Sequence, residues 1–287
     1  MIVMEGKSLA EQIKKEVTVE VDKFYQKHNK HIRLIVIQVG DNPASNIYIR
    51  NKEKACKECD IETETIKLSD DTKKNELISM ITELNDNSEV HGILVQLPLP
   101  DSFNQDDVNE VLSAISPVKD VDGFHNENMG AVMKHEYEII PCTPLGIVTM
   151  LYHYGISPSG KHCVVVGRSN IVGKPIAMMM LNENATVTIC HSKTQNLQQI
   201  CKDADILICA VGKPKFFTTE YIKEGAVVVD VGIHHTENGI CGDVDYENVC
   251  QMTSAISPVP KGVGAMTVAS LMSNCVRAAV LQTEGLY

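Results

Sequence analysis

Short apolar runs that alternate with helical segments constrain the fold of this chain more than any other feature. Runs of this kind, bounded by glycine, proline or polar residues, are typical of strands buried on both faces of a parallel sheet. Strands of this kind are predicted at 32–40, 90–100, 161–167, 185–192, 203–212 and 225–233, and a further strand at 61–68 is predicted from its alternation of apolar and polar residues. Because helical stretches separate them, the sequence predicts βαβ units on mostly parallel sheets.

A glycine loop joins a strand to a helix in the stretch VVVGRSNIVGKP, residues 164–175. Gly167 permits a tight turn, and a helix that begins near Gly173 offers backbone N–H groups to a pyrophosphate. The loop is not the usual G-x-G-x-x-G, because Ser169 occupies the second glycine position, and it is not a P-loop, because Pro175 stands where Ser or Thr binds Mg²⁺. It indicates a dinucleotide site, and an ordinary turn is the alternative.

The next strand ends in TICHSKT, which carries no carboxylate. In NAD-binding folds an acidic residue beyond the glycine loop accepts from the ribose 2′-hydroxyl. Here His191, Ser192 and Lys193 stand in its place, and Arg168 lies in the glycine loop on the same side. Cations and a hydroxyl favour a 2′-phosphate, and hence NADP, unless they are only solvated loop residues.

A lysine interrupts an apolar helix face in the first half. At about 100° per residue, one arc of the helix that follows Asp41-Asn42-Pro43 holds Ala44, Tyr48, Lys52, Ala55 and Cys59. Gln96 ends the apolar strand GILVQ, and Asp122 follows in the loop KDVDGF, so both suit a site at the carboxyl edge of a sheet. An amine that loses water there can carry a proton near neutral pH, whereas a snorkelling side chain is the alternative.

Composition narrows the possible partners. The 287 residues carry a formal net charge of −11 without a basic block, so neither nucleic acid nor an anionic membrane is expected as a partner. No apolar run is expected to reach the ~18 residues of a membrane span, and no signal peptide is evident at the start. The ten cysteines form no framework. Cys56 and Cys59 are expected to be structural, no metal site is predicted, and a reducing, cytoplasmic setting fits best.

Seven blocks together resemble one enzyme family along the chain from the first predicted strand of the first half to the terminal helix. They are VGDNPASNIYIRNKEKA, GILVQLPLP, KDVDGFH, PCTP, VVVGRSNIVGKP, ATVTICHSKT and SPVPKGVGAMTVA, in that order. Their sequence and spacing are similar to those of the bifunctional methylenetetrahydrofolate dehydrogenases/methenyltetrahydrofolate cyclohydrolases. That family oxidises 5,10-methylenetetrahydrofolate with NADP and hydrolyses the methenyl product to 10-formyltetrahydrofolate, in the one-carbon metabolism that supplies purine and amino-acid biosynthesis.

The resemblance implies two α/β domains with a substrate cleft between them. Residues 1–143, joined by the C-terminal helix at about 268–287, would bind tetrahydrofolate, and 144–267 would form a Rossmann-like NADP-binding domain. The usual assembly of the family implies a homodimer. The implied catalytic residues are Lys52, Tyr48 and Gln96; the implied substrate-binding residues are Asp122, Tyr48, Gln96 and Pro98; the implied cofactor-binding residues are Gly167, Arg168, Ser169, Ser192, Ile233 and Thr143.

Two residues depart from the family pattern. Lys261 stands where the family usually has glycine, and Ala265 stands where proline is usual. Two other readings stay open at this point: a different NADP dehydrogenase on a similar plan, such as a shikimate-type enzyme, and a non-catalytic folate- or nucleotide-binding protein. The first explains the second half of the chain but not the four polar residues of the first half.

Overall fold

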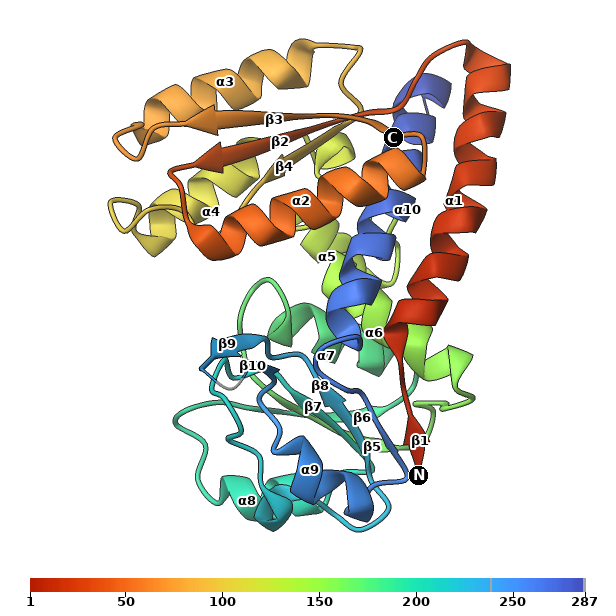
Figure 1. The fold of residues 1–287 in the computed structure, drawn as a ribbon, viewed down its shortest axis with the longest axis vertical. Helices are drawn as coiled ribbons and strands as arrows, with labels where there is room; N and C mark the ends of the chain where they lie inside the picture. Colours follow the sequence, from red (N-terminus) through yellow and green to blue (C-terminus); the bar gives the residue numbers. More distant parts are fainter. Residues whose placement is uncertain (238, 286–287) are drawn as a thin grey trace. The chain divides into compact units, whose positions relative to one another are not determined.

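The computed structural model describes residues 1–237 and 239–285, which divide into two compact units. Unit 1 holds Met1–Glu11, Val132–His135 and Thr143–Thr267; unit 2 holds Gln12–Ala131, Glu136–Cys142 and the chain from Val268 onward. Figure 1 shows the course of the chain through both units. The expected first domain, 1–143, included the N-terminus, whereas here the first eleven residues fall in unit 1.

Unit 1 is built on a six-stranded parallel sheet in the order β1-β11-β8-β7-β5-β6. The strands are β1 (Ile2–Val3), β5 (His162–Val166), β6 (Thr186–Cys190), β7 (Ile206–Cys209), β8 (Val227–Asp230) and β11 (Ala255–Ile256). Counted from β5, this is the doubly wound order 2-1-3-4-5, extended by β1 at the far edge. From β5 the chain first adds β6 on one side and then β7 on the other side of β5. The carboxyl ends of β5 and β7 are therefore the topological switch point, where ligands bind in such sheets.

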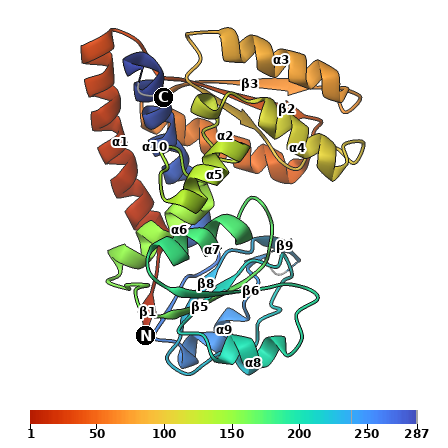
Figure 2. The same cartoon turned by 180° about the vertical axis from the view of Figure 1, so that it is seen from behind.

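Helices cover both faces of this sheet. They are α6 (Cys142–His153), α7 (Gly173–Asn182), α8 (Leu197–Lys202) and α9 (Tyr246–Val249). The connections from β5 to β6 and from β6 to β7 run in opposite directions along the sheet, so right-handed crossovers put α7 and α8 on opposite faces, as Figures 1 and 2 show. A hairpin of β9 (His234–Thr236) and β10 (Gly239–Cys241) follows β8; the sequence did not predict it.

Unit 2 centres on a three-stranded parallel sheet in the order β3-β2-β4. The strands are β2 (Arg33–Val39), β3 (Glu62–Leu68) and β4 (Gly92–Val95), and the helices are α1 (Gly6–His28), α2 (Pro43–Glu58), α3 (Lys74–Asp86), α4 (Gln105–Ala114), α5 (Asn126–Lys134) and α10 (Val263–Glu284). All seven predicted strands are present in the two units, with shorter bounds.

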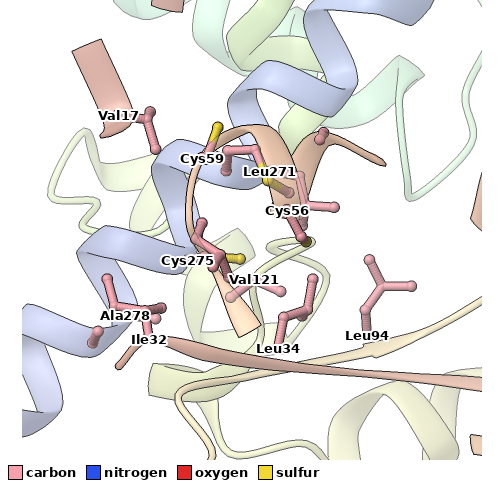
Figure 3. Packing of buried hydrophobic residues seen from close by; sticks show 14 of the residues in the cluster. Val17, Ile32, Leu34, Cys56, Cys59, Leu94, Val121, Leu271, Cys275 and Ala278 are labelled. Atoms are coloured by element: carbon pink, nitrogen blue, oxygen red, sulfur yellow. The ribbon is translucent and has the colours of Figure 1, made fainter. Parts of the chain in front are cut away.

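Alternating side chains of the buried strands divide the core of unit 2 into two layers. Leu34 and Leu94 face a cluster that also holds Cys56 of α2 and Cys275 of α10, shown in Figure 3. Ile35 and the other residues of opposite parity face α3 and α4. A strand buried on both faces reads as a continuous apolar run, which explains why the sequence pattern identified these strands.

Helix α10 bears on the expectation that no apolar segment is long enough to span a membrane. Its 22 residues reach a mean hydropathy of 1.3 over an 18-residue window, which is long and apolar enough to cross a membrane. Core helices pass the same test, and 56% of that window is buried inside the protein. Its side chains contribute to the cluster of Figure 3, so its apolar character has an explanation in packing.

The cysteines of the C-x-x-C motif are core residues. Cys56 and Cys59 are fully buried, and burial raises the pKa of their thiols to about 12 and about 11. A thiol with so high a pKa carries almost no thiolate at neutral pH and reacts poorly. No group of three or more ligating side chains suited to a metal ion occurs among residues 1–237 and 239–285.

His91 gives unit 2 a pH-dependent element. Its side chain is 2% exposed at the start of β4, packs edge-on against Phe24, and accepts at Nδ1 from the backbone N–H of Arg33. Burial, with a smaller contribution from the charge of Lys30, lowers its pKa from 6.5 to about 4. The folded state therefore holds the neutral imidazole.

We expect the folded protein to lose stability in acid because of His91. As pH falls from 6.5 towards 4, the unfolded chain binds a proton that the folded chain refuses, so its contribution to the free energy of unfolding falls by about 3 kcal/mol. His91→Asn keeps an acceptor near the position of Nδ1 but does not titrate. Urea unfolding at a series of pH values should show the stability gap between parent and variant narrowing in acid; two parallel curves would contradict the assignment.

Candidate active site

Helix α2 brings a lysine and a tyrosine to one side of unit 2. The Asn42 side chain caps the helix by accepting from the N–H groups of Ala44 and Ser45, and Pro43 occupies the first turn. The buried face runs through Ser45 and Ile49, whereas Ala44, which the predicted stripe included, is exposed. The buried arc is therefore centred slightly differently from the prediction.

Lys52 remains on the buried side of α2, half-buried, and reaches the end of a strand. Its Nζ donates to Oε1 of Gln96 at 3.0 Å, and the Gln96 amide donates in turn to the carbonyl of Leu97 at 2.6 Å. Gln96 itself is 8% exposed, and its backbone N–H pairs with Ile37 of β2. The glutamine is thus fixed by backbone on both sides, and it orients the lysine amine.

Tyr48 and Pro98 flank this pair. Tyr48 lies one helical turn before Lys52 on the same face and is half-buried, which raises the pKa of its phenol. Pro98 is exposed two residues after Gln96.

Asp122 interacts electrostatically with Lys52. Burial raises the pKa of its carboxyl, while the charge of Lys52 lowers it. The residue keeps some exposure to solvent. Lys52 thus forms a hydrogen bond with Gln96 and interacts electrostatically with Asp122.

The loop that carries Asp122 is held from both sides. Asp120, 1% exposed, accepts from the backbone N–H groups of Gly123 and His125 and from the Asn128 amide at 2.7–3.2 Å. On the other side, the Asn274 amide of α10 donates to the carbonyls of Val121 and Ile140 at 2.8 and 2.7 Å.

Sequence reasoning missed several polar residues of this region. Cys142 donates to the carbonyl of Val121 at 3.2 Å next to Asp122. The Ser45 hydroxyl is buried on the Lys52 side of α2, and within the described part of the chain no hydrogen-bond partner is found for it. Ser45 stands three residues before Tyr48 and seven before Lys52, so helical spacing alone could have singled it out.

The glycine loop of unit 1 lies at the switch point of the six-stranded sheet. Val166 pairs with both Cys190 and Cys209, so Gly167, His191 and Ala210 follow three neighbouring strands at the same edge. Gly167 has φ of +142°, and a Cβ there would lie 2.3 Å from the carbonyl oxygen of Ala210. Only glycine fits this position, which leaves the loop backbone open on its outer side.

Helix α7 begins tightly against this loop. A Cβ on Gly173 would meet the Gly167 carbonyl oxygen at 2.3 Å, so the glycine allows the helix to approach. The Ser169 hydroxyl accepts from the N–H groups of Val172 and Gly173 at 3.2 Å each. Arg168 and Ser192 are exposed at the same edge, after β5 and β6 respectively. This edge fits a dinucleotide with an extra phosphate, since it offers a glycine cradle, a cation and a hydroxyl but no carboxylate in the turn after β6.

The two remaining residues predicted to bind the cofactor are Thr143 and Ile233. Thr143 at the start of α6 shares a hydrogen bond of 3.0 Å with Thr267. Ile233 follows β8, two residues beyond Val231, whose N–H donates to the Cys209 carbonyl.

The departure at Lys261 preserves a glycine-like backbone. Lys261 has φ of +83°, in the region that favours glycine, and its carbonyl accepts from the Lys7 N–H at 3.1 Å. The side chain is exposed. The loop thus keeps the conformation at some cost in strain, on the order of 1 kcal/mol.

The doubly wound sheet with its glycine loop and the lysine–glutamine pair at the end of a parallel strand define a two-domain α/β protein of the nicotinamide-dinucleotide-binding class. Comparison with known proteins makes the assignment specific. The chain belongs to the tetrahydrofolate dehydrogenase/cyclohydrolase family: the model of its catalytic domain matches residues 4–122, and the model of its NAD(P)-binding domain matches residues 141–283.

Individual relatives agree over almost the whole chain. A bifunctional protein FolD from Lachnoclostridium phytofermentans is 53% identical over 97% of this chain and 98% of its own length. The crystal structure of the bifunctional FolD enzyme from Campylobacter jejuni has a TM-score of 0.93 at 45% identity, covering 97% and 98% of the two chains. The Trypanosoma brucei enzyme, complexed with NADP cofactor and an inhibitor, has a TM-score of 0.92 at 32% identity, covering 100% and 98%. The shikimate-type reading is therefore set aside.

Proposed function

We propose that this protein oxidises 5,10-methylenetetrahydrofolate with NADP and hydrolyses the resulting 5,10-methenyltetrahydrofolate to 10-formyltetrahydrofolate. Family membership over both halves supports the activity. The observation that carries the assignment of residues is the hydrogen bond between Lys52 and Gln96, with Asp122 in electrostatic reach. Formation of NADPH on addition of methylenetetrahydrofolate, run with NADP and NAD in parallel, tests the proposal; a protein that binds both compounds without turnover would be the non-catalytic alternative.

In the dehydrogenase step, the one-carbon unit gives a hydride to the cofactor, and the protein has only to align the two partners. We assign Asp122 to the pterin, because a carboxylate accepts two N–H bonds from its edge. Tyr48, Gln96 and Pro98 line the same substrate region in this proposal. NADP, when bound, supplies the hydride acceptor, and Gly167, Arg168, Ser169, Ser192, Ile233 and Thr143 would hold it.

In the hydrolysis step, water attacks the methenyl carbon and loses one proton, which leaves a neutral carbinol. The bond from that carbon to N5 then breaks as the remaining hydroxyl proton passes to N5, so that the formyl group stays on N10. We assign the proton released by the water to the amine of Lys52, which the Oε1 atom of Gln96 orients. In this proposal hydrolysis needs Lys52 as a base, whereas hydride loss requires no base at that carbon.

We further propose a cytoplasmic homodimer without nucleic-acid or membrane partners. Strand β6 is an edge strand of the six-stranded sheet. Ile189 on β6 is 39% exposed, and Leu181 on α7 is 52% exposed. An edge strand with apolar neighbours suits pairing with a second copy. Sedimentation should give the mass of two chains, and Ile189→Lys should shift it towards one chain. A monomeric parent would refute the assembly without bearing on the activity.

Lys52→Met should separate the two activities. The variant keeps the stem of the side chain and loses the amine, so hydrolysis should fall by ~10²–10⁴-fold, the usual contribution of a general base. The dehydrogenase should fall less, and methenyltetrahydrofolate should accumulate. The charge of Lys52 lowers the pKa of Asp122, so this pKa should rise in the variant. Both rates are therefore to be measured above neutral pH, where Asp122 stays ionised.

Lys57→Met is the matched control, since Lys57 is exposed on the same helix. It should leave the ratio of the two activities as in the parent. An unchanged ratio in Lys52→Met would reduce Lys52 to positioning the substrate, and full activity in both steps would make it a snorkelling surface lysine. Thermal melting should show that folding is kept, because methionine suits the buried side of α2.

Arg168→Ala should change the choice of cofactor. A charge-assisted hydrogen bond to a 2′-phosphate contributes roughly 1.5–3 kcal/mol, so affinity for NADP should fall about ten- to hundredfold while affinity for NAD hardly changes. Titration calorimetry with each dinucleotide measures the two affinities. Equal losses for NADP and NAD would mean that Arg168 lies away from the 2′-phosphate.

A further inference from the structure

A fully buried carboxylate in unit 1 collects four hydrogen-bond donors. Asp243 is 0% exposed. Its Oδ2 accepts from the backbone N–H groups of Val211 and Gly212 at 2.6 and 3.0 Å, and its Oδ1 accepts from the N–H of Lys213 at 2.9 Å and from Nε2 of His234 at 2.8 Å. A carboxylate offers about four acceptor positions, so His234 supplies the last donor and the only side chain among them.

The backbone of Asp243 is fixed by a second buried carboxylate. Asp230, at the end of β8, accepts from the N–H groups of Gly232, Asp243 and Val244 at 2.9–3.1 Å. Gly232 lies so close that a Cβ there would meet Oδ1 of Asp243 at 2.3 Å. The two aspartates therefore tie together the segments that follow β7 and β8.

These segments border the switch point. Residues 211–213 directly follow Ala210, whose carbonyl oxygen packs against Gly167. Ile233, predicted to contact the cofactor, stands between Gly232 and His234. Asp243 thus joins the loop after β7 to the segment with Ile233, and the loop after β7 in turn packs against the glycine loop after β5.

We propose that His234 is a positioning residue for the cofactor site. Its Nε2–H completes the shell of Asp243 and so fixes residues 211–213 and Ile233 where the dinucleotide binds; the inference rests on the proposed NADP-dependent function. An ionised Asp243 can only accept, which requires the hydrogen on Nε2. His234 acts through Asp243, and no step of the reaction is assigned to it.

The chain offers a matched set of variants. His234→Leu removes the donor. His234→Gln places an amide nitrogen near the former Nε2 and can reach Asp243, whereas His234→Asn is polar but too short. His235→Leu makes the same apolar change at the next residue of β9, which is exposed, since neighbouring side chains of a strand point to opposite faces.

The measurements are KM for NADP and kcat of the dehydrogenase, the cyclohydrolase rate from methenyltetrahydrofolate without NADP, and the Kd of NADP by calorimetry. We expect KM and Kd to rise about tenfold in His234→Leu, the effect of losing one hydrogen bond to a charged group. Because the loss concerns binding, kcat should change little. The cyclohydrolase rate should stay as in the parent, His234→Gln should restore KM, and His235→Leu should behave as the parent.

An unchanged KM and Kd in His234→Leu, or equal losses in His234→Gln and His234→Asn, would overturn the proposal. If His234→Leu does not fold, the Gln and Asn pair decides alone, because both are polar and only one reaches Asp243. A parent that forms no NADPH would refute the proposed function instead. In that case the Kd values for NADP still decide the role of His234, and a parent without NADP affinity would overturn both.

Discussion

Backbone N–H and C=O groups in the loops beyond parallel strands lie outside the ladder of the sheet, yet near the core they still need partners. Buried polar side chains supply many of them here. Asp243 and Asp230 do so for the loops after β7 and β8, and Asp120 does so for the loop that carries Asp122. The positions of the Asp122 loop and of the segments after β7 and β8 therefore depend on carboxylates that need not touch any ligand.

Such carboxylates are costly to bury. Burial raises the pKa of both Asp120 and Asp230 to about 7, against an ordinary value of 3.8, although the hydrogen bonds from backbone N–H groups oppose the rise. Since the folded chain holds these protons more tightly than the unfolded chain, their contribution to stability is largest in acid and is lost as pH rises through 3.8 towards 7. This trend is opposite to that of His91, so the pH dependence of the whole chain is a balance of opposed buried groups.

The sequence predicted most strands well because β2, β4, β5, β7 and β8 are buried on both faces and read as continuous apolar runs, whereas β3 is visible by its alternation. It also led to Lys52, Gln96 and Asp122, since a charge in an apolar stripe and polar residues beyond strands are visible in one dimension. The roles of these residues and the domain boundaries remain predictions. The hairpin β9–β10 and the place of β1 in the sheet were not predictable, because two- and three-residue strands carry little periodic signal. The donors around Asp243 are mostly backbone, which leaves no trace in the sequence.

The edge that carries the glycine loop holds two kinds of residue, tightly packed glycines and exposed polar residues. A Cβ on Gly167 or Gly173 would lie 2.3 Å from a backbone carbonyl oxygen, so neither position tolerates a side chain, whereas Arg168 and Ser192 are exposed at the same edge. Substitutions of the exposed residues need not disturb the packing beneath. If the proposed cofactor site is correct, single replacements at these exposed positions change the preference between related dinucleotides while the packed glycine loop stays as it is.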